Sequence, residues 1–435
     1  MWQNVRIWLT GVLLTVANAL WAQAAYDFIS RNWHFSASNY SIYPDSVQQH
    51  LTPPPPGKHP FYLSHYGRHG SRYLNRRMAY DIPYQMLCRA DSAGQLTALG
   101  KRVKAELATV IAGSEGRWGD LSDIGKQQMK GIATRMAANY PEIFAGQAVV
   151  QARSTIVNRC VMSMGTTVQQ LAALNPQLTI DMNASQRDTW FLNHQDKQLR
   201  DSMKSKRATT AYDEFWKPYT KNPRLMKLLF VNPDSLGRLV SEKWLSYYLL
   251  KTALIQQNTQ RADSTTIISL FTNDDIHHFW QIENAWWYTQ HGACLLNGGN
   301  QPYTQRFLLR KLIADADSCL RLQNPGAQLR FGHETVLLPL ACLLGLNGFH
   351  FQTSRLADLE PHGWWACLVF PMAANIQFVF YRKDIHDRDV IFKVLLNERE
   401  ATLPLPSSIA PYYHWSDFRH YYLQKLDKYS QERKK

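Results

Sequence analysis

Short apolar segments of the kind that form β-strands occur in both halves of the sequence, separated by a long stretch without clear strands. They are residues 61–66, 148–152, 328–331, 366–370, 376–381 and 390–396. Each is short and apolar, as core strands are. From about residue 186 to 301 the apolar residues follow helical spacing instead, most clearly at 243–254 and 276–288. The sequence therefore predicts an α/β core that is interrupted by an inserted α-helical cap.

These patterns divide the chain into five regions. We predict a signal peptide at 1–24, an N-terminal extended segment at 25–60, a first segment of the α/β core at 61–185, the α-helical cap at 186–301 and a second segment of the α/β core at 302–435. The extended segment contains the run Pro53 to Pro56, which favours a stiff spacer. We therefore expect folding to begin at Phe61.

The first 24 residues have the pattern of an export signal. Arg6 precedes an apolar stretch over residues 7–20, and the small residues Ala22 and Ala24 form a cleavage pattern. We therefore expect a secreted or periplasmic protein that begins near Ala25. No later stretch offers the roughly 20 uninterrupted apolar residues that a membrane span requires.

The sequence carries an excess of positive charge. It has 48 Lys and Arg residues against 34 Asp and Glu residues, a formal net charge of +14. Such an excess indicates a polyanionic partner, whether nucleic acid, an anionic surface or a heavily phosphorylated small molecule, or else it serves only solubility. The six cysteines permit disulfides in an exported chain, but their scatter leaves the pairing open, and buried free thiols are the alternative.

Several common catalytic motifs do not occur in the sequence. It has no P-loop, no Gly-x-Ser-x-Gly elbow and no paired Cys or His-x-x-x-His spacing. Nucleotide, serine-hydrolase and metal mechanisms therefore lack support, and we expect neither a cofactor nor a metal. The adjacent His277 and His278 are expected to lie on a helix rather than to bind metal.

The residues with the clearest chemistry follow the first predicted strand directly. They are Arg68, His69, Gly70, Ser71 and Arg72, and open α/β sheets bind ligands at such strand ends. A phosphoryl acceptor needs an unprotonated nucleophile and fixed positive donors, and a histidine between two arginines offers both. We expect the glycine to let the backbone approach the phosphate, and the loop to lie at the surface of the sheet.

This run resembles the Arg-His-Gly-x-Arg signature of the histidine acid phosphatases, a branch of the phosphoglycerate-mutase-like fold that includes many phytases. Residues 119–125 resemble the family's Leu-Thr-x-x-Gly helix start, with Ser122 as the expected N-cap. Residues 153–159 resemble the segment that supplies a further phosphate-binding arginine, which by register is Arg159 rather than Arg153. Residues 331–335 resemble the His-Asp or His-Ala-Glu element of the active site.

The resemblance implies a catalytic site with His69 as nucleophile and Glu334 as general acid, and with phosphate bound by Arg68, Arg72, Arg159 and His333. A carboxyl beside a phosphate shifts toward its protonated form, so Glu334 is expected to donate a proton at mildly acidic pH. The order His-Glu-Thr departs from His-Ala-Glu. A strict spacing would place Thr335 at the acid position.

Within the family, residues 331–346, 371–376 and 395–398 are most similar to the multiple inositol-polyphosphate phosphatases. The resemblance therefore implies a phosphomonoester hydrolase that acts through a phosphohistidine on inositol polyphosphates such as phytate. Its partner would be a polyphosphorylated small molecule and not nucleic acid. The alternatives are a broad-specificity acid or sugar phosphatase and, in another class, a non-enzymatic polyanion-binding protein. Binding alone needs neither His69 nor Glu334, which argues against the last alternative.

Basic residues after the signature and in the predicted cap are candidates for binding further phosphates. The candidates are Arg76, Arg77, Lys204, Lys206 and Arg207, with Lys217, Lys221, Arg224 and Lys227 adding positive charge to the cap. Each one alone is explained as a solvated surface residue. Together they favour a polyphosphorylated ligand over a neutral sugar monophosphate.

Overall fold

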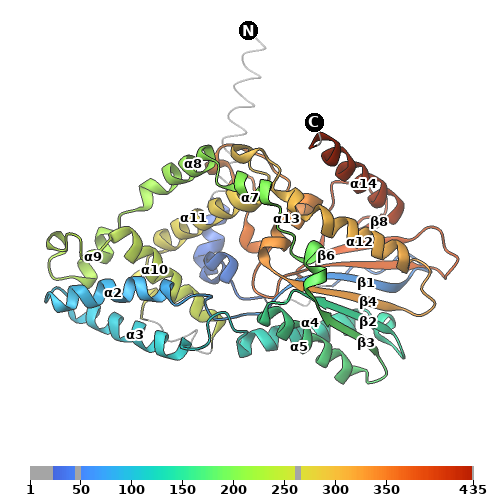
Figure 1. Ribbon diagram of the computed structural model, residues 1–435, viewed down its shortest axis with the longest axis horizontal. Helices are drawn as coiled ribbons and strands as arrows, with labels where there is room; N and C mark the ends of the chain where they lie inside the picture. Colours follow the sequence, from blue (N-terminus) through green and yellow to red (C-terminus); the bar gives the residue numbers. More distant parts are fainter. Residues whose placement is uncertain (1–22, 45–49, 260–265, 434–435) are drawn as a thin grey trace, which may run out of the picture.

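The computed structural model describes residues 23–44, 50–259 and 266–433. The predicted signal peptide therefore lies outside the described residues except for its last two positions. A mixed β-sheet with helices on both faces occupies one end of the molecule, and a group of helices occupies the other (Figure 1). The predicted α/β core with a helical cap is confirmed.

The sheet has eight strands in the order β3-β2-β4-β1-β5-β6-β7, with β8 paired to β6. The strands are β1 (His59–Arg68), β2 (Val149–Ser154), β3 (Thr179–Ala184), β4 (Gly326–Gly332), β5 (Asn375–Arg382), β6 (Ile391–Leu396), β7 (Arg399–Ala401) and β8 (Tyr412–His414). The first four run parallel to one another, whereas β5 pairs antiparallel with β1. The carboxyl ends of β1, β2 and β4 therefore share one edge, where open α/β sheets bind ligands.

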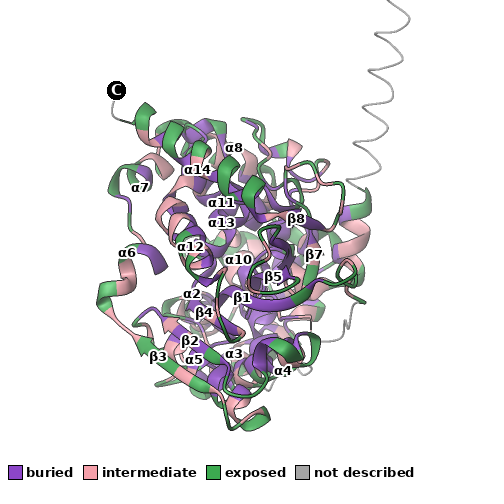
Figure 2. Cartoon of the chain, turned by 90° about the vertical axis from the view of Figure 1, so that its right-hand side faces the viewer, coloured by how far each residue is buried: buried purple, intermediate pink, exposed green. Residues whose placement is uncertain are grey.

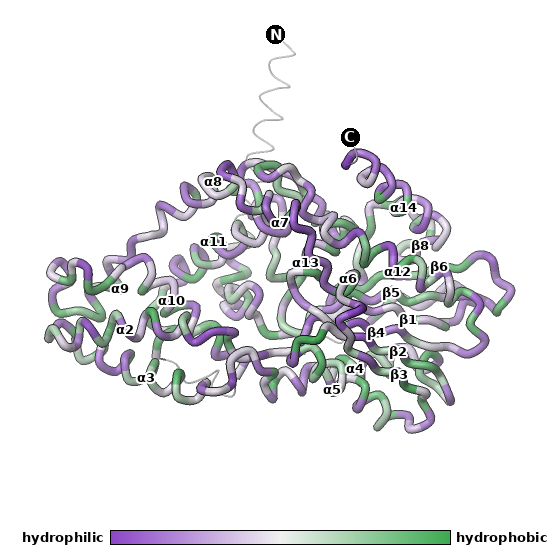
Figure 3. Tube along the Cα trace, in the orientation of Figure 1, coloured by the Kyte–Doolittle hydropathy of each residue, from purple (hydrophilic) through white to green (hydrophobic). Residues whose placement is uncertain are grey.

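Helices cover both faces of this sheet. On one face lie α4 (Asp123–Asn139) and α5 (Asn158–Leu174), and on the other α12 (Arg306–Cys319), α13 (Glu334–Leu344) and α14 (Trp415–Glu432) (Figure 1). Strand β1 serves both cores because its side chains alternate: Tyr62 and Tyr66 pack in one core and Leu63 packs in the other. Figure 2 shows β1, β5 and α13 as buried, and Figure 3 shows hydrophobic stretches among the strands of the sheet.

The cap is built from two separate stretches of the chain. It contains α2 (Met78–Ser92), α3 (Ala98–Ser114), α8 (Lys206–Trp216), α9 (Pro223–Leu229), α10 (Glu242–Ile255) and α11 (Asn273–His291), and the short α6 (Thr189–Leu192) and α7 (Lys197–Met203) lead into it. Leu87 and Val103 share a core with Leu229 and Leu249. The prediction that residues 61–185 belong wholly to the α/β core is therefore wrong for α2 and α3. Their spacing shows that they are amphipathic helices but not which surface they cover.

Two further predictions of local structure are wrong. The expected strand at 366–370 begins with the 3₁₀ helix η12 (Ala366–Leu368), and the segment is apolar because it is packed between core and cap. The expected extended segment at 25–60 is helical near its start, since residues 23–31 form a helix and Trp33–Tyr40 form the 3₁₀ helix η1. Ala25 and Ile29 pack into the core of the cap, which a spacer would not do.

The remaining sequence expectations concern cysteines and membrane spans. All six cysteines lie within the described residues and are free thiols, and five of them are buried. The structure thus favours the alternative of buried free thiols. In the described portion of the chain, no helix combines the length and apolarity needed to cross a bilayer.

Candidate active site

The loop that follows β1 is anchored by the sheet on both sides. The backbone N–H of Arg68 donates to the carbonyl of Ala374 on one side (2.7 Å), and the N–H of His69 donates to the carbonyl of Gly332 on the other (3.1 Å). Strand β1 lies between β4 and β5, so the residues at its carboxyl end can form backbone bonds with a neighbour on each side. The signature residues therefore leave the sheet at its ligand-binding edge.

Gly70 and Gly125 allow this loop to contact the start of α4 closely. A Cβ at Gly70 would lie 2.5 Å from the carbonyl oxygen of Gly125, and a Cβ at Gly125 would lie 2.2 Å from the carbonyl oxygen of Ser71. Ser122 caps α4 as predicted, accepting from the N–H of Gly125 (3.1 Å). Gly70 is thus required because the loop packs against α4, whereas the sequence alone suggested close approach of the backbone to phosphate as the reason.

His69 is held in one tautomer at the centre of the site. Its Nδ1 lies 2.9 Å from the carbonyl oxygen of Gly70. A carbonyl oxygen can only accept, so Nδ1 carries the proton and Nε2 keeps its lone pair. Burial and the neighbouring Arg68 hold the pKa of His69 well below its ordinary value. The side chain is 0% exposed, so the expectation of a surface position is wrong, but it is neutral and aimed as a nucleophile must be.

Three guanidinium groups surround His69, and several of their donors have no partner. Arg68 and Arg72 are at most 1% exposed. Nε of Arg72, Nε of Arg159, and Nε and Nη2 of Arg68 are buried without a hydrogen bond to any described residue. Buried donors without an acceptor are costly, and burial lowers the pKa of Arg68 to about 10 although it is paired with Glu334. Such a cluster is suited to an anion that accepts several hydrogen bonds at once.

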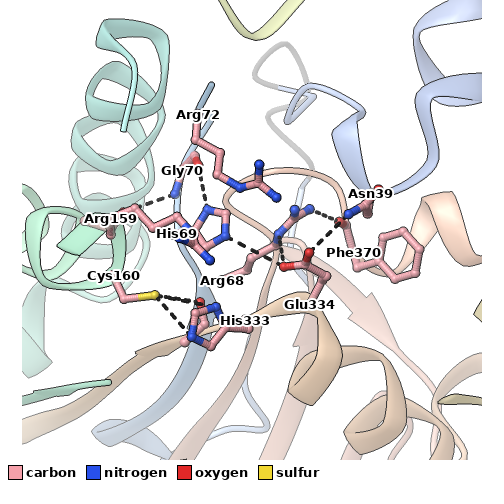
Figure 4. A network of polar contacts seen from close by, with 12 residues as sticks. Asn39, Arg68, His69, Gly70, Arg72, Arg159, Cys160, His333, Glu334 and Phe370 are labelled. Carbon is pink, nitrogen blue, oxygen red and sulfur yellow. Dashed lines mark hydrogen bonds and ion pairs between the residues drawn. The ribbon is translucent and has the colours of Figure 1, made fainter. Parts of the chain in front are cut away.

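Glu334 occupies the first turn of α13 and faces both His69 and Arg68. One carboxylate oxygen, Oε2, lies 3.0 Å from Nε of Arg68 and 3.7 Å from Nε2 of His69 (Figure 4). Burial by itself would raise the pKa of Glu334, but the surrounding cations, Arg68 above all, hold it well below its ordinary value. Without phosphate the group is therefore a carboxylate. The adjacent Thr335 is exposed, so Glu334 is the residue of this pair that reaches the site.

His333 stands at the N-cap position of α13, beside His69. The two ring centres are 5.9 Å apart. Nε2 of His333 is 3.3 Å from the hydroxyl of Thr155, and Sγ of Cys160 lies 3.8 Å from both ring nitrogens. Burial lowers the pKa of His333 to about 4, so the ring is neutral in the empty site. It can accept from Thr155 at Nε2 or donate there to a bound anion.

The site also contains the kinds of atom that bind metals. Among the described residues, His69, His333 and Glu334 offer ligand atoms that all lie within 4.8 Å of one another. Arg68 and Arg72 lie beside the same atoms and repel a divalent cation. The charge of the surroundings therefore favours an anion at this position.

The structure brings together the six residues that the sequence indicated most strongly. Figure 4 shows them around one point, from β1, α5 and the start of α13: Arg68, His69, Arg72, Arg159, His333 and Glu334. Arg153, the other arginine of the second segment, points to the sheet edge and pairs with Asp181 (2.5 Å). The register that selected Arg159 therefore agrees with the geometry.

The five basic candidates for additional phosphates are not members of this group. Arg76, Arg77, Lys204, Lys206 and Arg207 are all exposed, and no hydrogen bond or ion pair within the described structure joins them to the six central residues. Arg77 is engaged by Asp81 (3.0 Å) and Glu115 (3.1 Å). Their role in binding substrate stays a prediction.

Two site residues come from the N-terminal segment, where no sequence pattern marked them. Asn39 donates from Nδ2 to Oε1 of Glu334 (3.1 Å), and the ring of Tyr40 lies 5.1 Å from the guanidinium of Arg72. Both come from η1, far from the signature in sequence. Only the tertiary structure brings this segment to the site.

Comparison with known proteins identifies the family. The model of the histidine phosphatase superfamily (branch 2) matches residues 67–397, a range that contains all six central residues. The chain belongs to this superfamily. The predicted family is thereby confirmed.

Solved structures of an inositol polyphosphate phosphatase and of phytases share the fold of this one. Bifidobacterium longum multiple inositol polyphosphate phosphatase, in complex with inositol hexasulfate, superposes with a TM-score of 0.74 at 17% identity, over 88% of this chain and 96% of that chain. The phytase from D. castellii gives a TM-score of 0.63 at 13% identity, over 90% and 85% of the two chains. Hafnia alvei phytase with myo-inositol hexakis sulphate gives 0.51 at 11%, over 85% and 98%.

Proposed function

We propose that this histidine phosphatase hydrolyses inositol polyphosphates such as phytate through a phosphohistidine on His69. The observation that carries the proposal is the state of His69. Its Nδ1 proton is committed to Gly70, and its Nε2 lone pair lies beside Glu334 in a group of guanidiniums in which several buried nitrogens have no hydrogen-bond acceptor among the described residues. A site that only bound polyanions would need the guanidinium groups but no oriented nucleophile.

In the first step Nε2 of His69 attacks phosphorus, the N–P bond forms and the bond from phosphorus to the leaving oxygen breaks. Arg68, Arg72 and Arg159 donate to the equatorial oxygens, on which charge is spread in the transition state. The leaving inositol oxygen takes a proton from Glu334. The N-terminus of α13, at His333, adds a favourable dipole for the same charge.

Substrate binding itself supplies Glu334 with its proton. In the empty site Arg68 lies in an ion pair with Glu334 and keeps it ionised. An arriving phosphate attracts the same guanidinium and adds negative charge beside the carboxylate. Both effects raise the pKa of Glu334, so the group takes up a proton when the phosphate is bound. The sequence-based expectation of a protonated acid thus applies to the complex and not to the empty enzyme.

In the second step water attacks the phosphohistidine from the side that the leaving group has vacated. Glu334, now a carboxylate, takes a proton from the water, the N–P bond breaks, and inorganic phosphate forms. His69 returns to its neutral tautomer because Nδ1 keeps its bond to Gly70 throughout. The cycle needs no group beyond this chain's own side chains and water.

The substrate class is supported by charge and by fold. The net charge of +14 suits a ligand with several phosphates. The structure with the same fold that superposes at a TM-score of 0.74 is a multiple inositol polyphosphate phosphatase with an inositol hexasulfate bound. A broad-specificity acid or sugar phosphatase on the same scaffold is the competing assignment.

Phosphate release separates these assignments. Purified enzyme in the presence of a chelator should release inorganic phosphate from phytate with a higher kcat/KM than from a sugar monophosphate. Acid-labile, alkali-stable label from ³²P-phytate should be trapped on the wild type but not on His69→Ala. A higher kcat/KM for the sugar phosphate would indicate the broad phosphatase, and phytate binding without phosphate release would indicate a polyanion-binding protein.

We also propose that the protein is exported after cleavage near Ala25. The support is the sequence pattern of residues 1–24, most of which lie outside the described residues. N-terminal sequencing of protein from the periplasmic or extracellular fraction should begin near Ala25. Recovery of a chain that retains Met1 from the cytosol would contradict the proposal.

A further inference from the structure

The segment Trp33–Tyr43, here called the N-terminal strap, passes between the cap and the core. Its residues 36–39 are buried. It is fixed mainly by side chains of the short helix η6 (Gln256–Asn258): Nδ2 of Asn258 donates to the carbonyl of Tyr40 (2.6 Å), and Oε1 of Gln257 accepts from the N–H of Ile42 (3.0 Å). The strap precedes residue 67, where the match to the family begins.

The strap contributes the only partner that holds one oxygen of Glu334 among the described contacts. Nδ2 of Asn39 donates to Oε1 at 3.1 Å, and both residues are less than 9% exposed (Figure 4). The other oxygen, Oε2, faces Arg68 and His69 and has no hydrogen bond of its own. The two oxygens therefore have different tasks: one is held by an uncharged amide, and the other is turned toward the reacting centre.

This division decides which oxygen can carry the proton. In the empty site Arg68 lies beside Oε2 and disfavours a proton there. Once phosphate draws this guanidinium away, Oε1 still accepts from the amide N–H of Asn39, so the proton binds at Oε2, beside Nε2 of His69. Asn39 provides this orientation without adding a charge to the site. An aspartate at the same place would add a second carboxylate and raise the pKa of Glu334.

The backbone of the strap is adapted to this contact. Ser38 has φ 56° and ψ −118°, a conformation that glycine adopts easily and serine rarely does. It directly precedes Asn39. The next residue, Tyr40, has its ring 5.1 Å from the guanidinium of Arg72 and 5.6 Å from Nζ of Lys251. Backbone strain of this kind persists where the surroundings fix a functional geometry.

We propose that Asn39 is a positioning residue for the general acid: it holds Oε1 of Glu334 so that the proton is delivered from Oε2 to the leaving oxygen. The inference rests on the proposed function, because it assumes that Glu334 is the acid. It assigns a catalytic contribution to a segment that lies outside the family match.

The test compares two substrates that differ in their need for the proton. Asn39→Leu should lower kcat for phytate about tenfold to a hundredfold, because phytate needs a protonated leaving oxygen. It should lower kcat for p-nitrophenyl phosphate less than threefold, because that leaving group departs without a proton. Ser36→Ala is the matched control, since it removes a partly buried hydrogen bond within the strap, from the Ser36 hydroxyl to the carbonyl of Trp33 (2.6 Å), that does not reach Glu334. Equal losses on both substrates for Asn39→Leu would overturn the proposal.

A second variant covers the case in which Asn39→Leu does not fold. Asn39→Asp is nearly isosteric but places a carboxylate beside Glu334, which should shift the alkaline limb of kcat for phytate, the limb that reports the acid in the complex, to higher pH by about one unit. Ser36→Ala should leave that limb in place. An unshifted limb in Asn39→Asp would show that residue 39 does not act through the acid.

The Glu334→Gln background separates failure of this inference from failure of the proposed function. If Glu334→Gln slows both substrates equally, the acid role itself is wrong. If Glu334→Gln is selective for phytate but Asn39→Leu is not, only the inference about Asn39 is wrong. When both hold, adding Asn39→Leu to Glu334→Gln should cause less than a twofold further loss, because the two residues act as one unit.

Discussion

The loop after β1 and the N-terminal strap bring side chains to the same site, but they are held there by different kinds of contact. Backbone hydrogen bonds to Ala374 and Gly332 fix the loop, and these bonds follow from strand pairing whatever the side chains are. The strap has one backbone bond of this kind, from the N–H of Met372 to the carbonyl of Ser41 (2.8 Å), and it depends further on the side chains of Gln257 and Asn258. Substitution of Gln257 or Asn258 can therefore displace the strap, whereas the loop keeps its backbone bonds and is sensitive to side chains added at Gly70 or Gly125.

The comparison also separates chemistry from orientation. The loop supplies the nucleophile and two phosphate-binding guanidiniums, which the reaction cannot do without. The strap supplies Asn39, which only orients a group that is already present. Variants of the loop should therefore abolish turnover, and variants of the strap should reduce it in a substrate-dependent way.

The largest expected effect is that of His69→Ala. Removing Nε2 removes the group that accepts phosphate, so kcat for phytate should fall by about 10³-fold or more. The fold should persist, because the loop is held by backbone bonds that do not involve this side chain. Circular dichroism and phosphate release check the two halves of the prediction. His65→Gln, on the strand β1 that precedes the loop, is the control, and its kcat should stay within a few-fold of wild type. Substantial turnover by His69→Ala would place the nucleophile elsewhere.

Arg159→Ala should cause the next largest loss. Its Nε is buried and unpaired among the described residues, so it is free to donate to phosphate. A charge-assisted donor of this kind contributes about 3 kcal/mol to the transition state, which is a loss of about 10²-fold in kcat/KM. Arg153→Ala is the matched control, because Arg153 pairs with Asp181 at the sheet edge. Similar losses in both variants would remove Arg159 from the phosphate site.

The same distinction explains how much of the structure could be predicted from the sequence. The strands that frame the loop have short apolar patterns of their own, and the signature residues follow one of them directly, so Phe61–Arg72 could be placed with its chemistry. The segment 366–370 has an equally apolar pattern but is buried in a turn between core and cap, and apolarity alone does not distinguish the two.

Asn39 and the assignment of α2 and α3 to the cap depend on long-range packing instead. Asn39 meets Glu334 across 295 positions of sequence, and no local pattern marks it. The residues of α2 and α3 have the spacing of amphipathic helices, which would suit the core as well as the cap. Contacts of this kind, between residues far apart in the sequence, are visible only in the tertiary structure.

Glu334→Gln should act selectively on substrates that need a proton. Glutamine keeps the shape and can still contact Asn39, but it cannot deliver a proton from the position of Oε2. The rate on phytate should fall about 10²-fold, and the rate on p-nitrophenyl phosphate should fall much less. Comparing kcat for the two substrates checks this. Equal losses would mean that Glu334 only orients its neighbours, while the phosphohistidine step would stand.

The next effect concerns stability and pH, and it distinguishes the sheet side of the site from the strap. Burial lowers the pKa of His65 to about 3 and of His333 to about 4, while Asn39 on the strap does not titrate. The unfolded chain has histidine pKa values near 6.5, so it binds these protons first as the pH falls. Stability should therefore be unaffected above about pH 6.5 and should fall between about 6.5 and 4, by up to about 1.4 kcal/mol per pH unit for each histidine.

Thermal unfolding at pH 7 and pH 5 measures this loss. Inorganic phosphate should reduce it, because a bound anion favours the protonated form of His333. His65→Gln should also reduce it, and in that variant the remaining effect of phosphate should be unchanged, since His65 lies away from the anion-binding groups. A melting temperature that does not depend on pH between 7 and 5 would contradict the burial of these rings as neutral groups.

The smallest effect compares two strained residues, one on each side of the site. Ser38 in the strap and Ala373 beside the loop both have positive φ, 56° and 60°. Glycine at either position relieves strain but frees the unfolded chain, so the free energy of unfolding should change by less than about 1 kcal/mol in both.

The activities of the two variants should differ. Ala373 donates its N–H to the carbonyl of His69 (2.9 Å), and Ala374 accepts from Arg68, so the loop should stay in place and Ala373→Gly should keep its rate on phytate. In the strap the corresponding backbone bond runs from the N–H of Met372 to the carbonyl of Ser41 (2.8 Å), two residues beyond Asn39. It does not hold the Asn39 amide itself, so Ser38→Gly should let the amide turn away from Glu334 and lower kcat for phytate about two- to fivefold, with p-nitrophenyl phosphate unaffected. Steady-state rates of the two variants on both substrates measure the difference, and equal behaviour would show that the strap is held as firmly as the loop.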